Sequence, residues 1–138
     1  MRVVFMGTPD IAATCLEALV KEGFNVVGAV SQPDRPKGRG HKLMPTDVKV
    51  KAEEYGIPVY QPERLKEGQL EPILDELKPD IIAVVAYGKI LPKYVLDYPK
   101  YGCVNMHVSL LPKLRGAAPI QWAVLNGDKT TGVTTQLM

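Results

Sequence analysis

The chain has 138 residues, 46% of them apolar and 23% charged, which is the composition of one ordinary soluble globular domain. Its 17 lysines and arginines against 15 acidic residues leave a net charge of +2. This small charge excludes a protein that wraps DNA as histones do, and it means that any nucleic-acid site must be confined to a local patch. Two distant cysteines, Cys15 and Cys103, exclude a disulfide framework and argue against a structural zinc site. The longest apolar run, residues 81–87, is too short to cross a bilayer, and we expect a cytoplasmic protein.

The first half of the sequence alternates continuous apolar runs with amphipathic segments. Residues 3–6 are typical of a strand buried on both faces. Residues 11–20 carry apolar side chains at spacings of three and four, which predicts a helix capped by Thr8 or Asp10 and ended at Gly23. The segments that follow are predicted as a strand over residues 24–30, a long polar loop over 32–44, a helix over 45–55 capped by Thr46, and a strand over 57–60.

The second half continues this alternation. It predicts a helix over residues 70–77, a central strand over 80–86, a strand over 101–108, a helix over 117–125 and a last strand over 132–137. Strands alternating with helices predict an α/β fold with a doubly wound, mainly parallel sheet. Because the sequence stops inside an apolar strand, which would leave an unpaired edge, we expect the natural chain to continue past Met138.

An asparagine and a histidine stand two positions apart near the end of the strand predicted over residues 101–108. Alternate side chains of a strand share a face, so Asn105, His107 and Ser109 should point to the same side. A histidine exchanges protons near neutral pH, and an asparagine amide can stabilise an oxyanion. The pattern favours an acyl-transfer pair, and a core histidine bonded to backbone is the alternative. Ser109 lacks the GxSxG elbow of a nucleophile, and we interpret Cys103 as an apolar filler.

Two loops follow predicted strands, where parallel sheets bind their ligands. The turn over residues 7–10 holds one glycine rather than the three of the dinucleotide-binding fingerprint, and the chain has no phosphate-binding GxxxxGK[ST] loop. We therefore interpret residues 7–10 as a tight turn between a strand and a helix. The loop QPDRPKGRGHKLM over residues 32–44 carries four Lys and Arg residues against one Asp, a local charge of +3. Such a loop suits phosphates, and a solvated basic loop without a partner is the alternative.

Four segments resemble those of one enzyme family. They are VVFMGTPDIAA, SQPDRPKGRGHKLMPTDVKVKAEEYGIPVYQP, DIIAVVAYGKILP and GCVNMHVSLLPKLRGAAPIQWAVLNGD. Asn-x-His followed by SLLP and RGAAPI is close to diagnostic for folate-dependent formyltransferases, and the PDRPKGRG loop and GTPD turn favour the tRNA enzymes. The chain therefore resembles the N-terminal formyltransferase domain of methionyl-tRNA formyltransferases over nearly its whole length, which implies a Rossmann-like formyltransferase fold.

The resemblance implies a reaction and roles for particular residues. A formyl group would pass from 10-formyltetrahydrofolate, without a metal, to the amine of methionine on initiator tRNA. Asn105 would hydrogen-bond the formyl oxygen, and His107 would stabilise the tetrahedral oxyanion and help move protons. The folate would contact Tyr87, Gly88, Ile90, Leu91, Ser109, Leu110, Leu111 and Pro112. The tRNA acceptor end would meet Arg35, Lys37, Arg39 and Lys42.

The resemblance also implies parts that these residues do not include. The family's third catalytic residue is an Asp a few positions beyond Met138, where it would orient the imidazole and favour its charged form. A C-terminal β-barrel helps hold the tRNA. We therefore expect residues 1–138 to be part of an N-terminal domain, to be inactive or nearly so alone, and to belong to a full-length monomer.

Three other functions are alternatives that the residues alone leave open. The first is a formyltransferase that uses the same donor on a small amine, such as glycinamide ribonucleotide or an amino sugar, and would need no basic loop. The second is a non-catalytic RNA-binding module, which the small net charge and the few aromatic residues disfavour. The third is a nicotinamide dehydrogenase, which the missing glycines disfavour.

Overall fold

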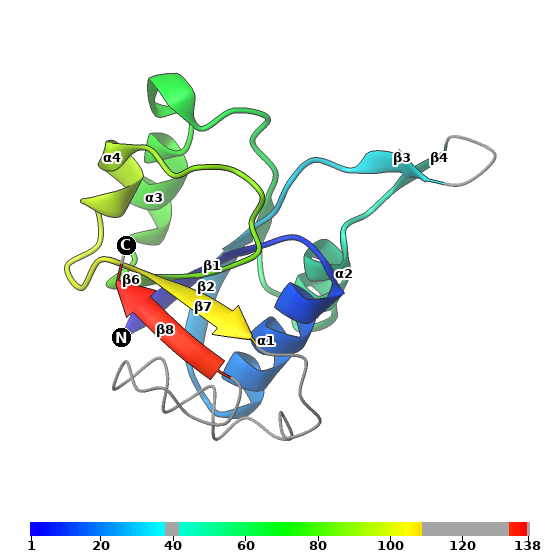
Figure 1. Ribbon diagram of the computed structural model, residues 1–138, viewed down its shortest axis with the longest axis horizontal. Helices are drawn as coiled ribbons and strands as arrows, with labels where there is room; N and C mark the ends of the chain where they lie inside the picture. The colour runs from blue at the N-terminus through cyan, green and yellow to red at the C-terminus, as the bar shows by residue number, and fades with distance from the viewer. Residues whose placement is uncertain (38–41, 109–132, 138) are drawn as a thin grey trace.

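A sheet of six strands in the order β5-β2-β1-β6-β7-β8 forms the centre of the computed structural model, which describes residues 1–37, 42–108 and 133–137 (Figure 1). The strands of this sheet are β1 (Arg2–Gly7), β2 (Asn25–Val30), β5 (Val59–Tyr60), β6 (Ile81–Val85), β7 (Cys103–Val108) and β8 (Val133–Leu137). The helices are α1 (Asp10–Lys21), α2 (Asp47–Glu54), α3 (Glu71–Leu77), α4 (Lys93–Leu96) and the 3₁₀ turn η1 (Lys66–Gly68).

The five strands from β5 to β7 are parallel to their neighbours, and β8 runs antiparallel to β7 at the edge. Helices cover both faces. Val3 and Phe5 of β1 pack in the same cluster as α1 and α2, whereas Val4 and Met6 pack with α3 and α4. Because alternate residues of a strand point to opposite faces, burial on both sides explains the unbroken apolar run. The predicted doubly wound, mainly parallel α/β fold is confirmed.

The helix ends correct one prediction and confirm two. The residue before α1 is Pro9, which makes no side-chain cap, so the cap expected from Thr8 or Asp10 is wrong. The Thr8 hydroxyl instead donates to the carbonyl of Tyr87 at 2.8 Å. Thr46 caps α2 as predicted, its hydroxyl accepting from the Lys49 amide at 3.1 Å. Gly23, with φ +88°, follows α1 as predicted.

The segment expected to be a structureless loop contains a β-hairpin. Strands β3 (Arg35–Lys37) and β4 (Lys42–Met44) pair antiparallel, and the hairpin projects away from the sheet (Figure 1). The prediction failed because Pro36 interrupts the strand signal, although a proline is tolerated in a two-stranded ribbon whose outer edge is unpaired. The short elements η1 and α4 were not predicted, and the helix expected over residues 117–125 lies outside the described residues.

A close approach of two backbones makes Gly7 a sensitive position. A Cβ atom placed on Gly7 would lie 2.6 Å from the Val85 carbonyl oxygen and 2.7 Å from Ala12 Cβ. We expect Gly7→Ala to lower the free energy of unfolding by about 1–3 kcal/mol, since neither neighbour can move cheaply. Gly28→Ala is the matched control, because its Cβ would meet the end of one side chain, Leu77 Cδ1 at 2.5 Å, and no backbone atom. Urea unfolding measures both, and equal losses of stability would contradict the argument.

Candidate functional site

Three strands end side by side at one edge of the sheet. β2, β1 and β6 are neighbours and parallel, so the residues that follow them, Gln32, Thr8 and Tyr87, come together. The Tyr87 carbonyl accepts hydrogen bonds from Thr8 Oγ1 at 2.8 Å and from Gln32 Nε2 at 3.1 Å. This is the edge at which open parallel sheets bind ligands.

The segment over residues 86–92, named the donor segment below, leaves β6 with an unusual backbone. Ala86 has φ +48° and Gly88 has φ +99°, both in the left-handed region that favours glycine. Of the predicted folate residues, Gly88 is exposed and Ile90 is 95% exposed, whereas Tyr87 and Leu91 are 2% and 5% exposed. Tyr87 and Leu91 are therefore packed beneath the segment, and Gly88 and Ile90 are the two of these four residues that a ligand can reach. The other predicted folate residues, Ser109, Leu110, Leu111 and Pro112, lie outside the described residues.

The Tyr87 side chain belongs to the core under the donor segment. It packs in the same cluster as Val84 and Leu74. Burial raises the pKa of Tyr87 to about 12, with a smaller contribution from Tyr94. The phenol therefore stays protonated at neutral pH, and the side chain anchors the segment from below.

The predicted catalytic pair lies on β7, next to β6. Asn105 is half-buried and stands opposite Val84 of β6 on one side and Gln136 of β8 on the other. In-register neighbours of a sheet share a face, so Asn105 lies on the face that carries Val84 and the helices α3 and α4. Further along β7, the backbone of His107 pairs with Thr134 of β8, and the His107 side chain lies outside what the structure describes.

A hydrogen-bonded group holds the base of the β3–β4 hairpin. Asp34 Oδ2 pairs with Lys49 Nζ of α2 at 3.1 Å, and Asp34 Oδ1 accepts from Gln61 Nε2 at 2.6 Å. The bonds from Gln61 and Lys49 lower the pKa of the Asp34 carboxyl. Gln61 Nε2 also donates to the Gln32 carbonyl at 3.1 Å. The hairpin base is therefore tied to the strand ends described above.

The predicted tRNA residues all belong to this hairpin. Arg35 begins β3 and Lys42 begins β4, and both are exposed. Lys37 ends β3 opposite Lys42, although its side chain lies outside the described part, as does the whole of Arg39. The hairpin thus brings Arg35 and Lys42, seven positions apart in sequence, onto one short ribbon.

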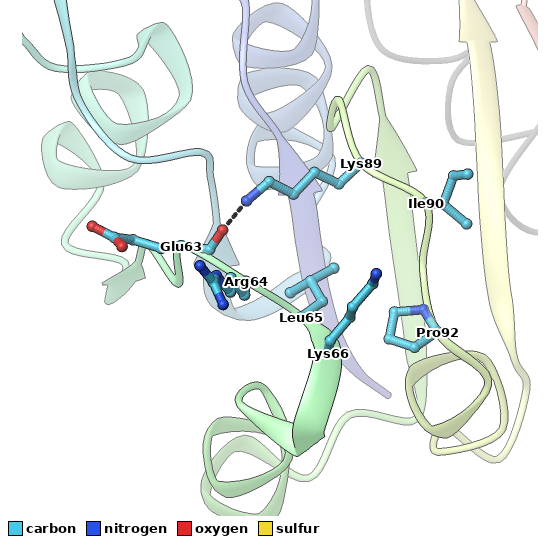
Figure 2. Close-up of a pocket in the computed structure, with 7 residues that line it drawn as sticks. All are labelled: Glu63, Arg64, Leu65, Lys66, Lys89, Ile90 and Pro92. Carbon is cyan, nitrogen blue, oxygen red and sulfur yellow. Dashed lines mark hydrogen bonds between the residues drawn. The ribbon is translucent and has the colours of Figure 1, made fainter.

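A cavity of about 600 Å³ opens beside the donor segment. Figure 2 shows the two segments that line it, with Lys89 reaching across to the Glu63 backbone carbonyl, to which it donates a hydrogen bond. The lining residues are Glu63, Arg64, Leu65, Lys66, Lys89, Ile90 and Pro92. The lining surface is mainly apolar, and three cationic residues against one carboxylate accompany it, which suits a ligand with an apolar body and an anionic group.

Neither cysteine is a nucleophile at neutral pH. Cys15 and Cys103 are buried, and burial raises the pKa of each thiol from 9.0 to about 12. The interpretation of Cys103 as a filler is consistent with its Sγ–H donating to the Val95 carbonyl at 3.5 Å.

The two thiols predict a loss of stability in alkaline solution. An unfolded thiol loses its proton near pH 9.0 whereas the folded one holds it to about 12, so the folded chain binds more protons between these values. We expect the free energy of unfolding to fall across this range by up to about 1.4 kcal/mol per pH unit for each thiol. Urea unfolding at several pH values tests this, and Cys15→Ala should make the decline shallower. An unchanged slope would contradict it.

Neither a metal centre nor a membrane span is found in the described residues. Within residues 1–37, 42–108 and 133–137, the His, Cys, Asp and Glu side chains form no group of three that could hold a metal ion. Every helix in the same ranges is too short or too polar to cross a bilayer.

Sequence reasoning missed several residues at this edge. Gln32 was part of a loop expected to be exposed, but it is 5% exposed, and no sequence signal marks it. Arg64, Lys66 and Lys89 meet around the cavity only because the chain passes through α3 and β6 and returns. Two basic residues close together and a third more than twenty positions away give no pattern that would predict this meeting.

Comparison with known proteins agrees with this geometry. The chain is 57% identical over 138 residues to a methionyl-tRNA formyltransferase of Pelotomaculum thermopropionicum, and 60% identical over 134 residues to one of Kosmotoga olearia. These matches cover 100% and 97% of the chain but 44% and 43% of the relatives, so the chain spans less than half of their length. A phosphoribosylglycinamide formyltransferase structure from Anaplasma phagocytophilum superposes with a TM-score of 0.63 at 24% identity, covering 100% of this chain and 64% of that one, which is evidence for the fold alone. The family model described as formyl transferase matches residues 1–138, and by this match over its whole length the chain belongs to the formyl transferase family.

Proposed function

We propose that the protein containing this chain transfers a formyl group from 10-formyltetrahydrofolate to the amine of methionyl initiator tRNA. The observation that carries the proposal is the position of Asn105, half-buried on β7 and in register with β6, beside the donor segment. In a member of the formyl transferase family, an amide at this position supports Asn105 as the group that meets the reacting formyl carbon.

The steps of the transfer can be assigned to two residues of this chain. The amine nitrogen attacks the formyl carbon, and the carbonyl oxygen becomes an oxyanion that the Asn105 amide stabilises by donating a hydrogen bond. The bond between the formyl carbon and N10 of the folate then breaks as the oxyanion collapses. His107 stabilises the oxyanion and carries the proton released by the amine towards N10, which suits a group that titrates near neutral pH.

The donor segment and its cavity support a reduced folate as the donor. Peptide groups left exposed by the left-handed residues Ala86 and Gly88 can bond a pterin edge. The cavity of about 600 Å³ falls in the size range of small-molecule sites. The three cationic residues that line it suit the carboxylates of the folate's glutamate tail. The resemblance adds residues 109–112 to the folate site and assigns no role to a metal.

The hairpin supports tRNA rather than a small amine as the acceptor. It projects from the body of the fold (Figure 1) and carries exposed Arg35 and Lys42, with Lys37 and Arg39 in the same segment. Exposed cations on a projecting ribbon suit a phosphate backbone, whereas a small amine needs no such extension. We also propose that residues 1–138 act with a further catalytic Asp and a C-terminal tRNA-binding barrel, in a cytoplasmic monomer.

The test is a chimera in which residues 1–138 replace the matched part of the Pelotomaculum thermopropionicum methionyl-tRNA formyltransferase, named the chimera below. We expect the chimera to formylate methionyl-tRNA with 10-formyltetrahydrofolate, and the 138-residue chain alone to show no turnover above its own His107→Ala variant. Glycinamide ribonucleotide is offered in competition. A chimera that formylates glycinamide ribonucleotide in preference to tRNA, or that uses neither acceptor, contradicts the proposal.

A further inference from the structure

The carbonyl of Tyr87 is held from two directions. Thr8, after β1, donates to it at 2.8 Å, and Gln32, after β2, donates at 3.1 Å. A carbonyl oxygen has two lone pairs, so these bonds use its full capacity. The backbone N–H of Gln32 also donates to Thr8 Oγ1, at 3.4 Å. The first turn of the donor segment is therefore fixed by side chains from two neighbouring strands.

The backbone that these bonds hold is one that a free chain avoids. Ala86 has φ +48° although it carries a Cβ atom, and such residues persist only when their surroundings over-determine them. A Cβ placed on Gly88 would lie 3.5 Å from Gln32 Nε2, so the Gln32 amide packs directly against the Gly88 backbone. Gln32 thus supports the left-handed turn both by its hydrogen bond and by contact.

The chemistry of Gln32 indicates that its donor group matters more than its volume. The side chain is buried, and Oε1 has no hydrogen-bond partner among the described residues. An unpaired buried acceptor is costly, and an apolar side chain of similar size would avoid that cost. What the glutamine adds is the bond from Nε2 to the Tyr87 carbonyl.

The other side of Gln32 faces the hairpin. The backbone carbonyl of Gln32 accepts a hydrogen bond from Gln61 Nε2 at 3.1 Å, and the same Gln61 nitrogen donates to Asp34 Oδ1 at 2.6 Å. Asp34 in turn pairs with Lys49 of α2 at 3.1 Å. A continuous path of hydrogen bonds therefore runs from the hairpin base through Gln61 and Gln32 to the Tyr87 carbonyl.

We propose that Gln32 is a positioning residue, which holds the donor segment in its binding conformation and connects it to the base of the basic hairpin. This inference rests on the proposed function, because it takes the donor segment as the folate site and the hairpin as the tRNA site. Through this connection, displacement of the hairpin by its partner alters the donor segment, and the two substrate sites respond to each other.

The test uses the chimera and two readouts. The first is the affinity for 10-formyltetrahydrofolate by calorimetry. The second is amide hydrogen exchange of residues 86–92. We expect Gln32→Met to weaken folate binding about tenfold, as the loss of one buried hydrogen bond implies, and to speed exchange in this segment. Gln61→Met, one step closer to the hairpin, should also speed exchange there. Gln69→Met, at an exposed glutamine, is the matched control and should change neither readout.

A second variant covers the case in which Gln32→Met does not fold. Thr8→Val keeps the shape of the side chain and removes the other donor to the Tyr87 carbonyl, so it should also speed exchange over residues 86–92. Unchanged exchange in both Gln32→Met and Thr8→Val overturns the positioning role, and unchanged exchange in Gln61→Met overturns the connection to the hairpin. If the unmodified chimera binds no folate, the proposed donor site is wrong, while the exchange data still decide whether Gln32 holds the segment.

Discussion

Asn105→Ala in the chimera is expected to lower kcat for formyl transfer about 10²–10³-fold, the usual cost of removing one oxyanion donor. The KM for 10-formyltetrahydrofolate should stay within a few-fold of the unmodified chimera's value, because the hydrogen bond from the amide strengthens only when charge develops on the formyl oxygen. Steady-state formylation of methionyl-tRNA measures both constants. His107→Ala should lower kcat by about 10²–10⁴-fold, the range for a general acid–base group.

The matched control for this prediction is Asn25→Ala. Asn25 is an exposed residue at the start of β2, at the opposite end of the strand from the site. It should leave kcat and KM unchanged. If Asn105→Ala raised KM alone and kcat were preserved, the amide would bind the donor in its ground state, and its assignment as the oxyanion donor would be wrong.

Neutralising the hairpin should weaken tRNA binding without affecting the chemistry of the donor. We expect the double variant Arg35→Ala, Lys42→Ala of the chimera to lose at least about tenfold in tRNA affinity, since hydrogen bonds to charged groups are among the stronger ones. Each lost phosphate contact should also reduce the slope of log K against log salt by about 0.7–0.9. Filter binding at several salt concentrations measures both quantities. Replacing Arg39 together with Lys42 should act in the same direction.

A control with the same loss of charge separates the local from the general effect. Lys93 and Lys100 are exposed, and α4, which begins at Lys93, lies at the far end of the molecule from the hairpin (Figure 1). The double variant Lys93→Ala, Lys100→Ala should change the salt slope much less. Equal slopes for the two double variants would mean that the hairpin is not the tRNA-contacting element.

Part of the site could be predicted because its signals are local. The alternation around Asn105 and the cluster of cations in residues 35–42 are both readable in a few adjacent positions, and Asn105 lies on the strand expected of it. The hairpin itself could not be predicted, because Pro36 and the glycines that follow it obscure the strand pattern, and because pairing of Arg35 with Met44 is a contact between segments. The Thr8 hydroxyl shows the same limit, since it accepts from the Gln32 backbone N–H rather than from a helix amide and donates to the distant carbonyl of Tyr87.

The amino-acid sequence by itself determined the alternation of strands and helices, the mainly parallel sheet and the strand that carries Asn105 and His107, because period and capping depend on near neighbours in the chain. Only the tertiary structure decided that Gln32 is buried against the donor segment, and that Arg64, Lys66 and Lys89 surround one cavity. These arrangements depend on which strands become neighbours in the sheet. The free energy that selects that order comes from burying both faces of β1 and β6, and no short stretch of sequence contains it.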